Sequence, residues 1–134
     1  MANKLFPKGA EKLLGPLNLT SATIKAALLS DAYTYSAAHE FLSDISASVL
    51  NTAQTLTSKS FTGGVFDAAD VVYTAVASGA NARYVALYSD TGTAGTSPLI
   101  FFVDTVTGLP MATNGGDITV QWDNGTYKIF SLVP

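Results

Sequence analysis

The stretch ARYVALYSDTGTAGTSPLIFFV, residues 82–103, decides the fold class. Its first part, ARYVALYSD, predicts a strand, in which successive side chains point to opposite faces of a sheet. One face would carry Ala82, Tyr84, Ala86 and Tyr88, and the other Arg83, Val85, Leu87 and Ser89. A loop of small residues then leads to the continuous apolar run LIFFV, which we also interpret as a strand. The stretch therefore predicts two strands joined by a loop rich in Thr and Gly.

The rest of the chain continues this pattern of short strands. The mostly apolar residues 23–30 (TIKAALLS) predict a central strand, the Thr-rich residues 52–61 an exposed one, and residues 71–76 another. Residues 36–45 (SAAHEFLSDI) predict a short helix with Ser36 as its N-cap. Short strands separated by Gly, Pro and Asn turns indicate a mainly β protein, an antiparallel β-sandwich or barrel with one or two short helices near the N-terminus.

A hairpin is predicted near the end of the chain, in ITVQWDNGTYKIF, residues 118–130. An Asn-Gly pair favours a two-residue type I′ turn, which would place Trp122 opposite Tyr127 and Val120 opposite Ile129. One apolar face would then contain Ile118, Val120, Trp122, Tyr127 and Ile129, whereas Phe130 would lie on the other face.

The N-terminal segment, residues 1–16, reads as an arm with a short helix, followed by a single β domain over residues 17–134. Pro7 suits the first helical position, and Gly15-Pro16 would end the helix. The arm combines cations with apolar anchors, so we predict that it packs against a neighbouring subunit of an assembly through Lys4, Leu5, Phe6, Lys8, Lys12 and Leu13. The alternative is a terminal arm whose lysines form a solvated face.

Tyr33 and Tyr35, in DAYTYS, are further candidates for an interface, because tyrosine buries a large area and keeps a hydroxyl to satisfy. A role in packing explains them equally well. Tyr84 and Tyr88 are candidates for recognition as well, and the alternative interpretation makes them core residues on one face of a strand.

The composition bounds the possible partners. Charged residues make up 13% of the 134 residues, about half of the roughly 25% typical of soluble domains. A surface so poor in charge repels neighbours weakly, which suits a subunit of an assembly and equally a secreted protein. The net charge of −3 argues against a nucleic-acid partner. No apolar run approaches the ~20 residues that cross a bilayer, and no secretory signal is seen, so we expect synthesis in the cytoplasm and no membrane partner.

Motifs for chemistry are sparse. Any Ser-His-Asp triad would have to use His39, the only histidine, which we interpret as a surface or capping residue. Asp67 and Asp70 lack the surrounding ligands of a Ca²⁺ loop and are interpreted as turn residues, and the glycine-bearing loops lack the Lys of a phosphate cradle. The absence of cysteine excludes thiolate ligands and nucleophiles. We predict no catalytic residue, no metal and no cofactor, and therefore a protein that is not an enzyme.

Five segments together resemble a group of small structural-module proteins of tailed bacteriophages: ANKLFPKGAEKLL, TIKAALLSDAYTYSAAHEFLSDI, GVFDAADVVYTAV, YSDTGTAGTSPLI and NGGDITVQWDNGTYKIFSL. The resemblance spans nearly the whole chain. It implies a virion component made in the cytoplasm of a host bacterium, and within the virion a capsid decoration (cement) protein. Such a protein would bind the major capsid protein and copies of itself, as a homotrimer. The alternative is a tail, baseplate or adsorption protein that binds host glycan through DAYTYS and the small-residue loops.

Overall fold

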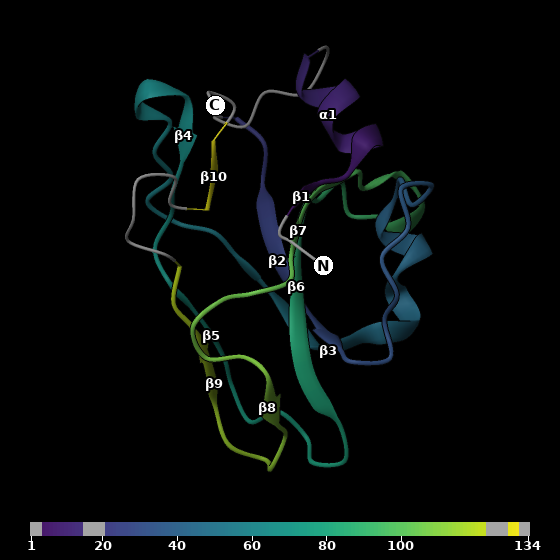
Figure 1. Cartoon of the computed structure of the whole chain (residues 1–134), viewed down its shortest axis with the longest axis vertical. Helices are drawn as coiled ribbons and strands as arrows, with labels where there is room; N and C mark the ends of the chain where they lie inside the picture. The colour runs from purple at the N-terminus through teal and green to yellow at the C-terminus, as the bar shows by residue number, and fades with distance from the viewer. Residues whose placement is uncertain (1–3, 15–20, 123–128, 132–134) are drawn as a thin grey trace.

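An antiparallel sheet forms the centre of the protein (Figure 1). The structure is a computed structural model that describes residues 4–14, 21–122 and 129–131. The strands of the sheet lie side by side in the order β1 (Lys4–Leu5), β7 (Leu99–Val103), β6 (Asn81–Ser89), β2 (Ile24–Ser30) and β3 (Val49–Thr55), and β8 (Met111–Ala112) pairs with the start of β6. The fold is mainly β and β-sandwich-like, with one short α-helix near the N-terminus, as the sequence predicts.

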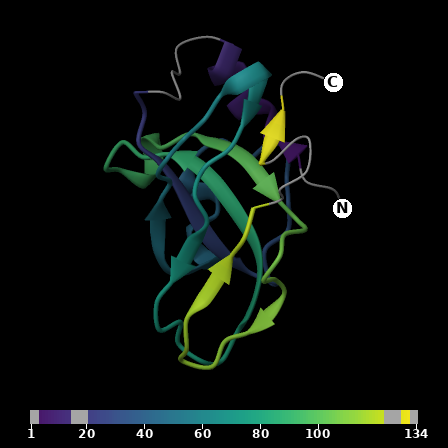
Figure 2. The same ribbon diagram turned by 90° about the vertical axis from the view of Figure 1, so that its left-hand side faces the viewer.

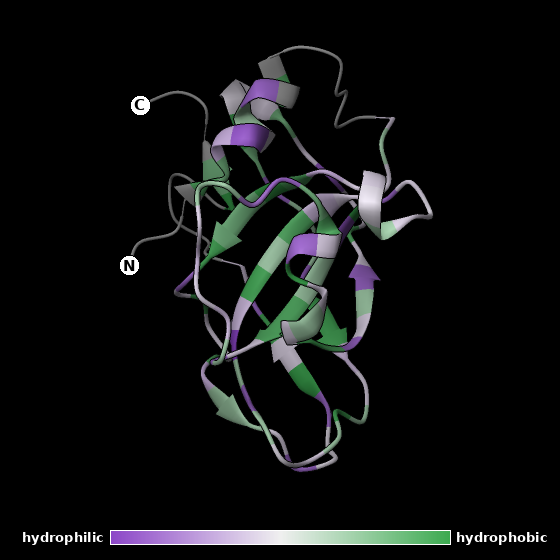
Figure 3. Ribbon diagram, turned by 90° about the vertical axis from the view of Figure 1, so that its right-hand side faces the viewer, coloured by the Kyte–Doolittle hydropathy of each residue, from purple (hydrophilic) through white to green (hydrophobic). Residues whose placement is uncertain are grey.

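Both faces of this main sheet are covered. On one face lie two small sheets, β4 (Val65–Phe66) with β10 (Phe130–Ser131), and β5 (Val71–Tyr73) with β9 (Ile118–Val120) (Figure 2). On the other face lies the chain that connects β2 to β3, which contains the 3-10 turns η1 (Leu42–Asp44) and η2 (Ser46–Ser48) (Figure 3). Two more 3-10 turns, η3 (Thr62–Gly64) and η4 (Ala94–Thr96), lie in loops.

Two hydrophobic cores result, one on each face of the main sheet. The intersheet core lies between the main sheet and the small sheets, and its largest members include Ile24, Leu28, Tyr73, Leu87, Ile100, Phe101, Ile118, Trp122 and Phe130. The loop-side core lies under the β2–β3 connection and consists of Phe6, Ala27, Leu29, Tyr33, Ile45, Ala86, Tyr88, Leu99 and Phe102.

Strand β6 confirms the predicted alternation, with one exception. Tyr84, Ala86 and Tyr88 face the loop-side core, whereas Val85 and Leu87 face the intersheet core. Ala82 was predicted on the face of Tyr84 but lies in the intersheet core, because the β2–β6 register shifts between Leu29 and Ser30. The extra residue in this bulge reverses the alternation. All five residues of β7 are buried, since both of its faces are covered.

Some predicted boundaries were wrong, for local backbone reasons. The strand predicted at 52–61 begins and ends earlier, at Val49 and Thr55. The strand predicted at 71–76 stops at Tyr73, two residues before Ala75, which has a left-handed φ of 51° that a strand excludes.

The helix predicted over residues 36–45 does not form, and that range contains only the turn η1, with η2 directly after it. The carboxylate of Asp44 accepts hydrogen bonds from the backbone N–H groups of Glu40 and Phe41, at 2.8 and 3.0 Å. In a helix those N–H groups would donate to carbonyls four residues earlier, so this side chain competes with the helix for them.

The predicted closing hairpin is also wrong in its pairing. Val120 pairs with Val71 on one edge of β9, and Gln121 bridges Thr107 on the other, so both edges are occupied. The N–H of Ile129 donates instead to Phe66 at 3.0 Å. The turn and Tyr127 lie outside the described residues.

The predicted apolar face nevertheless holds, since Ile118, Val120, Trp122 and Ile129 are all in the intersheet core. Phe130, predicted on the opposite face, joins the same core because a bend at Ile129 precedes β10.

The N-terminal segment is built into the main sheet. Helix α1 (Pro7–Leu14) begins at the predicted proline. Before it, β1 pairs with β7, and the N–H of Phe6 donates to Ile100 at 2.9 Å. The helix then approaches β7 so closely that a β-carbon on Gly9 would collide with the carbonyl oxygen of Leu99 and lie 2.8 Å from the Cα of Ile100.

Replacing Gly9 with alanine tests this contact, because the expected change in the free energy of unfolding is opposite to that in a free helix. In a free helix the change would stabilise by up to about 1 kcal/mol. Here the added methyl group meets backbone atoms, so we expect Gly9→Ala to lower the free energy of unfolding by about 1–3 kcal/mol, measured by urea denaturation. Gly95→Ala is the control, because a β-carbon there meets nothing within 4 Å. A stabilised Gly9→Ala protein would contradict the docked position of α1.

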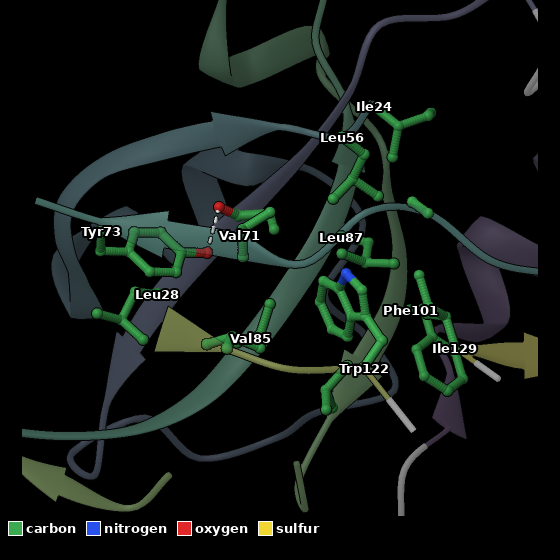
Figure 4. Close-up of a cluster of buried hydrophobic side chains, with 14 of the residues drawn as sticks. Ile24, Leu28, Leu56, Val71, Tyr73, Val85, Leu87, Phe101, Trp122 and Ile129 are labelled. Carbon is green, nitrogen blue, oxygen red and sulfur yellow. Dashed lines mark hydrogen bonds between the residues drawn. The ribbon is translucent and has the colours of Figure 1, made fainter. Parts of the chain in front are cut away.

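Tyr73 joins the two layers by a hydrogen bond inside the intersheet core (Figure 4). Its side chain is fully buried, and its hydroxyl donates to the carbonyl oxygen of Ala26 in β2 at 2.7 Å. The bond lies beside the irregularity between Ala26 and Leu28 in the β2–β3 ladder. One polar contact thus sets the position of β5 over the main sheet.

Removing the hydroxyl of Tyr73 tests the contribution of this hydrogen bond to stability. We expect Tyr73→Phe to reduce the free energy of unfolding by about 1–3 kcal/mol, because the buried carbonyl of Ala26 loses its donor. The measurement is urea denaturation followed by the fluorescence of Trp122, the only tryptophan. Val72→Thr on the same strand, at a side chain that is 43% exposed, should change stability little. Equal effects of the two substitutions would argue against the bond.

Candidate recognition surface

An aromatic cluster joins the N-terminal segment to the β2–β3 connection. Phe6 stacks on Tyr35 with ring centroids 5.3 Å apart, and Phe102 contacts both rings, at 6.3 Å and 5.2 Å. Tyr33 and Tyr84 complete the cluster, each packed against Phe102, at 5.7 Å and 5.2 Å. The cluster thus packs the N-terminal segment, the β2–β3 connection and strands β6 and β7 against one another.

The apolar side chains predicted for an interface pack mainly within the chain itself. Phe6 is fully buried and Tyr33 is 6% exposed, while Tyr35 is half-buried. Leu5 and Leu13 are half-buried against the intersheet core. Of the two readings of Tyr33 and Tyr35, packing within the chain is thus the one seen in this structure.

Of the three predicted cations, Lys8 is the one whose side chain lies within the described part of the structure. Lys8 extends from α1 with 46% of its side chain exposed and lies 3.6 Å from Glu11, which is 65% exposed. Lys4 belongs to β1, before the helix begins, so it is not on the helix face. The side chains of Lys4 and Lys12 lie outside the described part of the structure. The face of α1 that a neighbour could reach thus includes Lys8 and Glu11.

His39 belongs to the same region through a hydrogen bond between its Nδ1 and the hydroxyl of Tyr33, at 2.9 Å. Burial, with a smaller contribution from Tyr35, raises the pKa of Tyr33 to about 12. The hydroxyl therefore stays protonated at neutral pH, the opposite of what an activated nucleophile requires. The hydrogen bond links two parts of the β2–β3 connection.

Carboxylates elsewhere also bind the backbone or a neighbouring cation. Asp70 accepts the backbone N–H of Trp122 at 2.9 Å. Asp90 lies 3.0 Å from the ammonium group of Lys25, and the backbone N–H of Gly92 and that ammonium group lower its pKa. In the TGTAGTS loop that follows, the hydroxyl of Thr91 bonds those of Thr96 and Ser97, at 2.7 and 3.1 Å. These contacts order the loops.

One contact that sequence reasoning missed lies at the bulge in β6. The guanidinium carbon of Arg83 lies 5.3 Å from the centre of the Tyr84 ring. Adjacent strand residues normally point to opposite faces, and the register shift brings these two together. Alternation alone could not reveal this.

Within the described ranges, no three His, Cys, Asp or Glu side chains form a group that could hold a metal ion. None of the helices in that part of the chain is long and apolar enough to span a bilayer. Comparison of the sequence with protein-family models and with curated proteins found no match to either.

The carboxylate of Asp44 provides a test of how the β2–β3 connection is held. The N–H groups of Phe41 and Glu40 lower its pKa below the usual value of 3.8. Its stabilising contribution is thus complete above that value and is lost as the pH falls through the lower, folded-state pKa. We expect Asp44→Ala to cost about 0.5–2 kcal/mol at neutral pH, as for helix caps.

The difference in unfolding free energy between the parent and Asp44→Ala should shrink as the pH falls below about 4. Thermal denaturation at neutral and acidic pH would measure it. Glu11→Gln, on the exposed face of α1, is the control and should show no comparable change. A cost that is the same at both pH values would mean that the ionised carboxylate is not the stabilising group.

Proposed function

We propose that this chain is a non-enzymatic structural protein of a bacteriophage virion, and more specifically a capsid decoration protein that binds the head lattice as a homotrimer. The resemblance of its sequence segments to structural-module proteins of tailed phages suggests the class. The structure contributes physical arguments for how such a protein would bind a lattice.

The observation that carries the proposal is the firm attachment of α1. Strand pairing of β1 with β7, full burial of Phe6 and the close approach of Gly9 to Leu99 hold the helix at one end of the molecule (Figure 1). A binding surface that is already ordered loses little conformational entropy when it meets a partner. The exposed face of α1 is therefore suited to a repeated lattice contact.

The rest of the surface favours close neighbours. Charged residues are 13% of the chain, and exposed strand positions include threonines such as Thr52 on β3 and Thr119 on β9. A surface of this kind gives little electrostatic repulsion between copies crowded on a shell. This supports a homotrimer and a neighbouring capsid protein as partners.

The roles of the polar groups support a scaffold as well. His39 bonds the hydroxyl of Tyr33, and Asp44 and Asp70 accept backbone N–H groups. An active site needs a nucleophile or base free to meet a substrate. In this chain these groups instead hold loops in place.

A charge reversal on α1 tests the proposal. Deletion of the N-terminal segment would expose the loop-side core, because Phe6 is part of it, so a surface substitution gives a cleaner answer. We expect Lys8→Glu to weaken binding to purified capsids that lack the protein by about fivefold, since an exposed charge contact contributes up to about 1 kcal/mol. Binding would be followed by cosedimentation, and the position and symmetry of the bound protein by electron cryomicroscopy.

The control is a doubly substituted protein, Thr52→Glu with Thr119→Glu, which changes the net charge by the same amount on exposed strand positions away from α1. It should bind like the parent, and both variants should keep the parent's thermal midpoint. If Lys8→Glu binds with unchanged affinity, α1 is not the contact. A position on the tail or baseplate would overturn the decoration role in favour of the alternative virion location.

A further inference from the structure

A pocket opens where β8 meets the start of β6. Figure 1 shows that β8 lies at the other end of the molecule from α1. It has a volume of about 330 Å³ and is lined by Asp31, Asn81, Arg83, Pro110, Met111 and Ala112. This is near the lower end of the range of about 300–1,000 Å³ for small-molecule sites. The space suits a single small ring.

Backbone pairing positions the polar side of this pocket. The N–H of Asp31 donates to the carbonyl oxygen of Asn81 at 3.0 Å, which continues the β2–β6 ladder past its last paired residue. The side-chain amide of Asn81 then donates to Oδ2 of Asp31 at 3.2 Å. The carboxylate is thus held by its neighbour while remaining exposed to solvent.

Arg83 forms the second polar side. Its guanidinium group lies over the ring of Tyr84, and Tyr84 is itself packed in the aromatic cluster. A guanidinium group stacked on an aromatic face keeps its N–H groups in its own plane, where they can donate to a ligand. The bulge at the start of β6 is what turns Arg83 toward this side.

The third side is apolar. β8 pairs with β6 through Asn81 and Ala112, and through Ala82 and Met111, which brings Met111 and Ala112 beside the start of β6. The side chain of Met111 is 42% exposed, and among the described residues it shares such exposure with Phe61 and Val72. A ligand with both an apolar face and polar edges would cover it.

We propose that this pocket binds one ring of a neutral sugar. A carboxylate, a carboxamide and a guanidinium group provide acceptors and donors for adjacent hydroxyls, and the C–H face of the ring would cover Met111 and Pro110. The single negative and single positive charge of Asp31 and Arg83 give the pocket no net charge, which disfavours purely anionic or purely cationic ligands. The inference goes beyond the proposed structural role and does not depend on it.

The experiment is a titration of the ¹⁵N-labelled full chain with methyl glycosides of glucose, galactose, mannose and N-acetylglucosamine, followed by amide chemical shifts. For at least one of them we expect saturable shifts of the Asp31, Asn81 and Ala112 amides, with a dissociation constant on the order of 1 mM, as fits a shallow pocket. Asp31→Ala and Arg83→Gln should each weaken binding at least about tenfold.

Glu11→Gln is the matched control, because it removes an exposed charge at the opposite end of the molecule, and it should bind as the parent does. Parallel titrations with inorganic sulfate and with L-alanine test an anion and a zwitterion against the sugar. The proposal is overturned if no glycoside gives saturable shifts, if the shifts lie elsewhere, if they survive both pocket substitutions, or if sulfate or alanine binds more tightly. These outcomes are separate from capsid binding, which is measured with other residues.

Discussion

The structure depends on covering the apolar strand β7 on every side. All five of its residues are buried, and it has β6 on one edge. Without β1 its other edge would present unpaired backbone groups and the rings of Phe101 and Phe102, a template for pairing with another chain. The segment Lys4–Leu5 fills part of that edge, Phe6 seals the loop-side core beside it, and Gly9 lets α1 sit directly on the strand. The N-terminal segment is thus a structural cover for β7.

The two faces of the main sheet are both apolar and are covered in different ways. The intersheet core is closed by two short strand pairs, with Tyr73 tying one of them to β2 through the Ala26 carbonyl. The loop-side core is closed by irregular chain, whose backbone groups require other partners. Asp44 supplies acceptors for two of them, and the Tyr33–His39 bond holds another part of the connection. The side chains of Tyr33, His39 and Asp44 thus support this connection through hydrogen bonds.

Two surfaces of the described structure are the sites that we propose for binding. One is the face of α1, held rigidly at one end and bearing Lys8 and Glu11. The other is the pocket around Asp31, Asn81 and Arg83 at the opposite end. Their separation would let a protein attached to a lattice through one end present the other to solvent (Figure 1). In our proposals, the first would contact a protein partner and the second a small polar ring.

Much of the fold could be predicted from the sequence, because local pattern controls it. Alternation over residues 82–90 placed Tyr84 to Tyr88 on their correct faces, the run LIFFV indicated a strand, and Pro7 marked the start of α1. Pairing partners were decided only by the tertiary structure. Asn124-Gly125 predicted a hairpin, yet β9 pairs with β5 and β10 with β4. The pairing partners of these strands are set by contacts between segments that are distant along the chain, which a local turn motif does not specify.

For the candidate sites, too, the sequence determined some features and the tertiary structure decided others. The sequence by itself determined the residue types available: few charges, one histidine, no cysteine and an N-terminal segment of lysines and apolar anchors. Only the tertiary structure decided that Phe6 and Tyr33 pack inside the chain and that Arg83 lies over Tyr84 beside Asp31. The physical reason is that such contacts join segments distant along the chain, and one of them depends on a one-residue bulge, which leaves no periodic signal in the sequence.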